Sequence, residues 1–165
     1  MLKRTLAMAI ILFSTELNAG AIGIDAPKRL GQASFSFLGA KLYSATLYCD
    51  RESFAWDADI SLELVYSRSI KKSALIKATM IELKRMEGTR GDQSAIAQQL
   101  ETCFANVGKG DSFVATATQN NQVRLYLNGS QSCTLKADNI KKRFLGIWLS
   151  DNSRSPALSK QLRVQ

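Results

Sequence analysis

Hydrophobic and polar positions alternate in the early part of the chain. In residues 34–37 two phenylalanines alternate with two serines, and in residues 60–66 one face carries Ile60, Leu62, Leu64 and Tyr66. Alternation with a period of two is typical of strands that bury one face. Residues 42–49 are rich in aromatic and other strand-favouring side chains. We therefore predict three strands here, preceded by a lead-in segment up to about Leu30.

The middle of the chain shows helical spacing instead. Apolar residues recur at this spacing in residues 73–86, and a cleaner stripe in residues 93–107 consists of Ile96, Leu100, Cys103, Phe104 and Val107. A stripe of this kind is typical of a helix that packs against a core. Because Cys103 lies on the stripe, we expect it to be a buried and inert thiol.

A second group of strand-like segments follows, at residues 111–118, 123–127 and 131–135. The pair Asn128-Gly129 favours a two-residue hairpin, since both residue types tolerate a positive φ.

Two amphipathic helices are predicted at the end of the chain. Asp138 is expected to cap the first, and Ser155 the second, with Pro156 at its first helical position. In the first helix, the neighbouring cations Lys141, Lys142 and Arg143 are expected to point away from the core.

The order of elements is therefore strands, helices, strands, helices. This order differs from the regular strand–helix alternation of a doubly wound parallel sheet. We predict an α+β domain in which six or seven antiparallel strands carry three or four helices on one face.

The first residues have the features of a secretory signal. Lys3 and Arg4 precede a short apolar run, and small residues then offer cleavage sites after Ala19 or Ala21. The apolar run is too short to span a bilayer. We expect a signal peptide at residues 1–21, a single domain at residues 22–165, a periplasmic location and no membrane span.

The formal net charge is +8, with basic residues dispersed along the sequence. Such a charge can indicate nucleic acid or an anionic membrane surface. Because the densest basic cluster is only residues 141–143, we predict a solvated surface and no nucleic-acid partner. Weak attraction to anionic lipid is the minor alternative.

The sequence contains no histidine and three cysteines, Cys49, Cys103 and Cys133. The absence of histidine excludes serine–histidine and cysteine–histidine hydrolases and makes zinc or copper sites of the usual kind improbable. The acidic residues around 50–59 lack the spacing of a calcium loop. We predict no metal and no cofactor. One disulfide is possible, and any of the three pairings could form it.

Five short motifs in a fixed order are similar to those of a known family. They are LYSATLY at 42–48, LELVYSRSI at 62–70, GD at 110–111, YLNG at 126–129, and FLGIWLS with PAL at 144–158. Together they resemble the bacterial chalcone isomerase-like proteins, over about residues 31–162. The resemblance implies an open-faced β-sandwich with a ligand cleft between sheet and helices. Fatty-acid-binding relatives bind a carboxylate there through an arginine.

The resemblance does not extend to the catalytic residues of plant chalcone isomerase. Residues 31–37 lack the arginine of the corresponding strand, and residues 93–103 contain no lysine, tyrosine or asparagine. Tyr43 falls roughly where the plant enzyme has an active-site threonine. An enolate-like transition state needs preorganised donors, so we predict no catalytic residues here.

The polar residues that remain near the expected cleft are Tyr43, Tyr48, Tyr66 and Arg68, of which Tyr43, Tyr66 and Arg68 are the candidate ligand-binding residues. Trp56 and Trp148 are expected to be packing residues. Three functions stay open: a binding domain for a small apolar or carboxylate-bearing ligand, an isomerase or lyase with altered substrate, and a protein-interaction module whose cleft is filled by its own side chains. The oligomeric state stays open too.

Overall fold

The computed structural model describes residues 23–164, so the predicted signal peptide at residues 1–21 lies outside the described residues. This part of the chain forms a six-stranded sheet with the strands in sequence order and every neighbouring pair antiparallel. The strands are β1 (Lys28–Phe37), β2 (Ala40–Cys49), β3 (Ile60–Tyr66), β4 (Ser112–Ala117), β5 (Val123–Leu127) and β6 (Ser130–Leu135).

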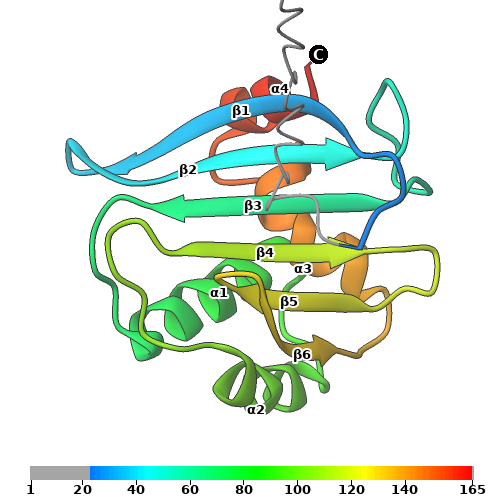
Figure 1. Ribbon diagram of the computed structural model, residues 1–165. Helices are drawn as coiled ribbons and strands as arrows, with labels where there is room; N and C mark the ends of the chain where they lie inside the picture. The colour runs from blue at the N-terminus through cyan, green and yellow to red at the C-terminus, as the bar shows by residue number, and fades with distance from the viewer. Residues whose placement is uncertain (1–22, 165) are drawn as a thin grey trace, which may run out of the picture.

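Four helices complete the described part of the chain: α1 (Lys72–Glu87), α2 (Gln93–Cys103), α3 (Ile140–Leu149) and α4 (Pro156–Arg163). They lie behind the sheet in Figure 1, with α4 against β1 at one edge and α2 beside β6 at the other. The prediction of an α+β fold with helices on one face is confirmed. None of these helices is long and apolar enough to cross a membrane.

Most element boundaries follow the sequence patterns, and two differ for identifiable reasons. Strand β1 begins at Lys28, earlier than the predicted strand at residues 34–37. The alternation does not reveal this first half, because a register shift between Arg29 and Gly31 interrupts it. Helix α2 ends at Cys103, because Val107 leaves the helix to pair with Ile70 in an isolated bridge.

The predicted hairpin at Asn128-Gly129 is confirmed. Leu127 pairs with Ser130, and both turn residues have the positive φ that a two-residue turn requires, 49° for Asn128 and 82° for Gly129. The β1–β2 hairpin has the same form, with φ of 48° at Leu38 and 77° at Gly39.

The start of α3 differs from the prediction. Asn139, not Asp138, occupies its N-cap position. Helix α4 begins at Ser155 and Pro156 as predicted, although the Ser155 hydroxyl makes no capping hydrogen bond. Of the three cations expected to point to water, only Lys142 is exposed.

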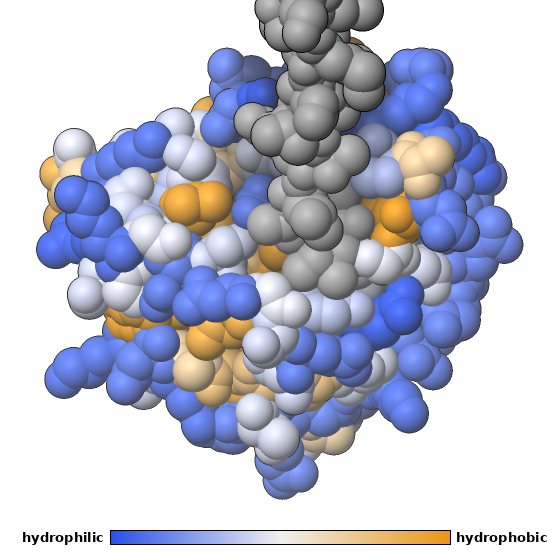
Figure 2. All heavy atoms as spheres, viewed as in Figure 1, coloured by the Kyte–Doolittle hydropathy of each residue, from blue (hydrophilic) through white to orange (hydrophobic). Residues whose placement is uncertain are grey.

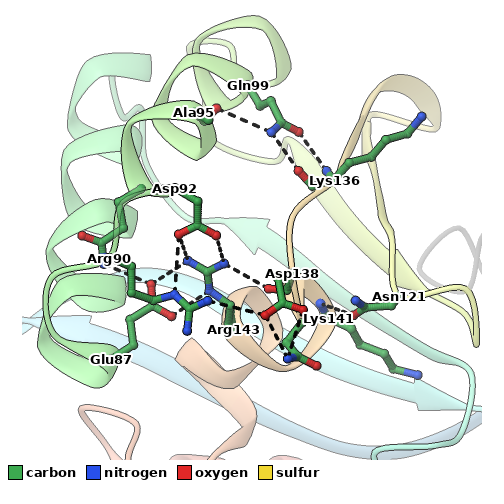
Figure 3. Close-up of polar contacts among 12 residues, drawn as sticks. Glu87, Arg90, Asp92, Ala95, Gln99, Asn121, Lys136, Asp138, Lys141 and Arg143 are labelled. Carbon is green, nitrogen blue, oxygen red and sulfur yellow. Dashed lines mark hydrogen bonds and ion pairs between the residues drawn. The ribbon is translucent and has the colours of Figure 1, made fainter.

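Arg143 is buried because anions from other elements enclose it. Its guanidinium donates to the Glu87 carboxylate at 2.7 and 2.8 Å and to the Asp92 carboxylate at 2.6 and 3.0 Å (Figure 3). Burial alone would raise the pKa of Glu87, but the hydrogen bonds from Arg143 and Gln93, together with the charges of Arg143 and Arg90, outweigh it and lower that pKa. Lys141 is buried as well, and its ammonium donates to the Ala58 carbonyl at 2.5 Å.

Cys103 is not an inert thiol. It forms a disulfide with Cys133, because the end of α2 lies over β6 and places the two Cα atoms 5.2 Å apart. The bridge closes a loop with a sequence separation of 30 residues, which in the chain-entropy model stabilises the fold by about 3 to 4 kcal/mol. Cys49 is free and buried.

The backbone of α4 packs directly on Gly31 in β1. A Cβ atom at position 31 would lie 2.3 Å from the Gln161 carbonyl oxygen and 2.4 Å from that of Leu162. Neither oxygen belongs to a flexible side chain, so any larger residue has to push α4 off the sheet. The glycine therefore fixes how closely α4 approaches β1.

We predict that Gly31→Ala lowers the free energy of unfolding by about 3 kcal/mol, the scale of an overpacked core. Gly91→Ala is the matched control, since no atom lies within 4 Å of its added Cβ, and we expect it to change stability by less than about 0.5 kcal/mol. Urea denaturation of both variants measures the difference. Equal midpoints for the two would contradict the close packing of α4 on β1.

Candidate ligand-binding cleft

A cleft of about 810 Å³ lies between strands β1 to β4 and helices α1, α3 and α4. This volume is in the upper part of the range for small-molecule sites. Most of its lining is apolar: Ala33, Phe35, Phe37, Leu42, Leu64 and Phe113 from the sheet, and Leu75, Ala78, Ile81, Ile147, Leu158 and Leu162 from the helices.

Helix α1 has apolar residues on two faces. Ile76 and Leu83 are buried in the core, whereas Ala74, Ala78 and Ile81 follow a second helical stripe that is exposed and lines the cleft. Helix α1 therefore presents an apolar wall to open space instead of sealing the sheet.

Tyr43 and Trp148 form the polar contact in the floor of the cleft. The Trp148 indole donates to the Tyr43 hydroxyl at 2.9 Å, and the Phe35 ring stacks on Tyr43 with centroids 5.3 Å apart. The enclosed hydroxyl has its pKa raised to about 12, mainly by burial. Burial also raises the pKa of Tyr66, whose ring meets Tyr43 edge-on. Both hydroxyls are therefore neutral near pH 7 and do not act as bases there.

Glu82 lies on the opposite wall, between two arginines. It accepts hydrogen bonds from Arg154 at 2.6 Å and Arg85 at 2.9 Å. Burial alone would raise the pKa of Glu82, but the two arginines outweigh it and lower the pKa below its usual range. This carboxylate is ionised and already paired, so it is a poor proton acceptor for a substrate.

Arg68 and Lys71 differ from the other charged residues of the cleft. Arg68 follows the end of β3, and Lys71 occupies the N-cap position of α1. Both line the cleft, and neither side chain makes an ion pair or hydrogen bond with residues 23–164.

The N-terminus of α1 adds to this positive region. Its first turn contains no acidic residue, and its N-cap residue is itself a cation. Helix N-termini carry partial positive charge and favour anions. Arg68, Lys71 and the start of α1 therefore form one cationic end of an otherwise apolar cleft.

All three residues predicted as ligand-binding, Tyr43, Tyr66 and Arg68, line the cleft. The prediction that Tyr48 also lies near the cleft is wrong. Tyr48 alternates with the cleft-facing residues of β2, pairs with Ser61 of β3 and does not line the cleft. Trp148 is more than a packing residue, because it lines the cleft and bonds Tyr43.

Glu82 is a further residue of the cleft that the sequence pattern did not indicate. The spacing of Glu82 and Arg85 on one helix was the available signal for its pairing. Its second partner, Arg154, belongs to a distant loop.

The cleft is mostly apolar, and its ionisable groups have defined states. Its tyrosines are neutral, Glu82 is paired with arginines, and in residues 23–164 no group of His, Cys, Asp and Glu could hold a metal ion. The cleft therefore offers a ligand apolar walls and one cationic end.

The comparisons with known proteins agree with this architecture. The family model described as chalcone isomerase-like matches residues 34–162, and the chain belongs to this family. Among solved structures, a fatty-acid-binding protein of Arabidopsis thaliana is similar in fold, with a TM-score of 0.66 and 12% sequence identity over 87% of this chain and 89% of that chain. No curated protein matches the sequence.

The raised pKa of Tyr43 predicts a loss of stability in alkali. Its pKa is about 12 in the folded protein against 10.0 for a free side chain, so the stability it contributes is present below pH 10.0 and is lost as pH rises toward 12. Over this pH interval the free energy of unfolding should fall in both proteins, but by roughly 2 kcal/mol less in Tyr43→Phe than in the wild-type protein.

Denaturation at several alkaline pH values measures this effect. Trp148→Phe is the control, since it keeps the tyrosine and removes a hydrogen bond that lowers its pKa, so the alkaline loss should persist. If Tyr43→Phe and wild type showed the same pH dependence, the hydroxyl would not be enclosed as described.

Proposed function

We propose that this chain is an exported, non-catalytic binding protein whose cleft holds a small apolar ligand with an anionic end, such as a fatty acid. The observation that carries the proposal is an open apolar cleft with a cationic end at Arg68 and Lys71, whose side chains have no polar partner within residues 23–164. An acyl chain fits the apolar walls. A carboxylate fits the end where charge is uncompensated.

Arg68 is the residue that best matches a carboxylate. A guanidinium offers a planar pair of donors that a carboxylate accepts together. Tyr66 lines the cleft two residues earlier in the chain, and its hydroxyl can donate to the same group. The neutral state of that hydroxyl, favoured by its raised pKa, suits it to donate a hydrogen bond near pH 7.

The open cleft favours ligand binding over the alternative of a protein-interaction module. In that alternative the protein's own side chains fill the space, whereas about 810 Å³ is open here. The isomerase alternative is disfavoured because the groups able to move protons are neutral or already paired. The segment that carries helical donors in the plant enzyme, residues 93–103, contributes only Cys103 to a small secondary pocket and nothing to the cleft.

Export to the periplasm is part of the proposal. Its support is the signal-like pattern of the first 21 residues and the Cys103–Cys133 disulfide, since such bridges persist in oxidising compartments.

We predict that Arg68→Ala weakens binding of a long-chain fatty acid roughly 5- to 30-fold, because a partly exposed hydrogen-bonded ion pair is worth about 1 to 2 kcal/mol. Displacement of a fluorescent fatty acid measures the affinity. Arg124→Ala is the matched control: Arg124 lies on the other face of the sheet, between the core residues Val123 and Leu125, and its loss should leave affinity unchanged.

The methyl ester of the same fatty acid separates charge from apolar contact. It should bind wild type no more tightly than the free acid binds Arg68→Ala, because the ester also loses the attraction of Lys71. Equal affinity of both arginine variants for the acid would remove Arg68 from the site. Ring closure of a chalcone by the wild-type protein well above the spontaneous rate would overturn the non-catalytic assignment.

A further inference from the structure

Two large apolar side chains project at the tip of the β1–β2 hairpin. Leu38 is 90% exposed and Phe37 is 61% exposed. Figure 1 shows this hairpin reaching beyond the ends of the neighbouring strands, and Figure 2 shows hydrophobic side chains at its tip, at the left edge of the view. Neither residue belongs to the buried core.

The conformation of Leu38 makes its apolar side chain unusual. Its φ of 48° lies in the left-handed region, which a bulky residue adopts only with strain and which Gly, Asn and Asp favour. The β5–β6 hairpin has almost the same turn and uses Asn128 at this position, with φ 49°. The turn therefore does not need a leucine. Because Leu38 is so exposed, its side chain also adds little packing to the fold.

The surroundings of the tip are basic. Residues 28–49 and 64–81, which include the hairpin, the end of β3 and the first part of α1, contain Lys and Arg but no Asp or Glu, and the next residue, Glu82, is already paired with Arg85 and Arg154. Within the described chain, four cations here have no side-chain partner: Lys41, Arg68, Lys71 and Lys77. The acidic residues of the β2–β3 loop, such as Asp50 and Asp57, follow the far end of β2.

The tip also borders the cleft. Phe37 and Leu42, on either side of the turn, line it, and Ile81 on α1 lines it while remaining 48% exposed. Whatever covers the hairpin tip therefore also faces the opening of the cleft.

We propose that the β1–β2 hairpin tip docks on the surface of an anionic lipid bilayer, with the cleft mouth turned toward the lipid. Exposed Leu and Phe side chains enter the interface between headgroups and acyl chains, and the surrounding cations are attracted to anionic headgroups. Docking in this orientation lets an apolar ligand pass between bilayer and cleft without crossing water. That transfer rests on the proposed function, whereas docking itself does not.

Co-sedimentation with vesicles tests the docking. The folded protein should bind vesicles of phosphatidylcholine with phosphatidylglycerol more strongly than vesicles of phosphatidylcholine alone, and high salt should reduce the difference. Leu38→Asn should weaken binding about tenfold, through loss of the buried apolar side chain, while keeping the turn, since asparagine suits this φ. Val65→Thr is the control, because Val65 is exposed on β3 but does not line the cleft.

A second variant tests the charges without touching the cleft. Neither Lys41 nor Lys77 lines it, so Lys41→Ala with Lys77→Ala should weaken binding to the anionic vesicles and leave fatty-acid affinity in solution unchanged. Fatty-acid affinity, measured without vesicles, should also be unchanged in Leu38→Asn.

Three results would overturn the docking proposal: no vesicle binding by wild type, equal binding by Leu38→Asn and wild type, or a Leu38-dependent dimer in light scattering without vesicle binding. The last would assign the tip to a second copy of the chain. Failure to bind fatty acid in solution, with vesicle binding intact, would instead overturn the proposed function alone.

Discussion

The ion cluster around Arg143 determines where helix α1 lies, and the cleft depends on that position. Arg143 of α3 is almost fully buried and bonds Glu87 at the end of α1 and Asp92 just before α2. Burying the Arg143 charge is costly unless it is paired and hydrogen-bonded, which its bidentate contacts with the two carboxylates achieve. Helix α1 packs closely on α2 and α3 rather than along the strands. In that position its exposed stripe of Ala74, Ala78 and Ile81 faces the cleft.

The walls of the cleft are also held by polar contacts between elements. Glu82 joins α1 to the loop that bears Arg154, and Tyr43 accepts a hydrogen bond from Trp148 of α3. Each of these contacts fixes a wall of the cleft. The side chains of Arg68 and Lys71 make no ion pair or hydrogen bond within residues 23–164, so a ligand can use them without breaking a contact of the described fold.

Local patterns predicted the elements, and distant partners decided what the patterns missed. The strict alternation in residues 60–66 gave β3 without error, since each residue's face follows from its position alone. The register shift beside Gly31 hid the start of β1, and the partner of Cys103 depended on how α2 meets β6. Arg143 was assigned to the surface because its anions lie 51 and 56 residues away in sequence. Tyr43, Tyr66 and Arg68 could be placed near the cleft from strand alternation and family resemblance, whereas the pairing of Glu82 with Arg154 could not.

The central claim, that an acyl ligand occupies the cleft beside Trp148, is tested most directly by tryptophan quenching. The protein has two tryptophans; Trp148 lines the cleft, and Trp56 packs on Phe54 away from it. A fatty acid brominated along its chain quenches indole on contact, so Trp56→Phe isolates the signal of Trp148 and Trp148→Phe isolates that of Trp56. The account predicts saturable quenching of Trp148 and none of Trp56. Equal quenching of both, or no quenching of Trp148 at saturating ligand, would contradict it.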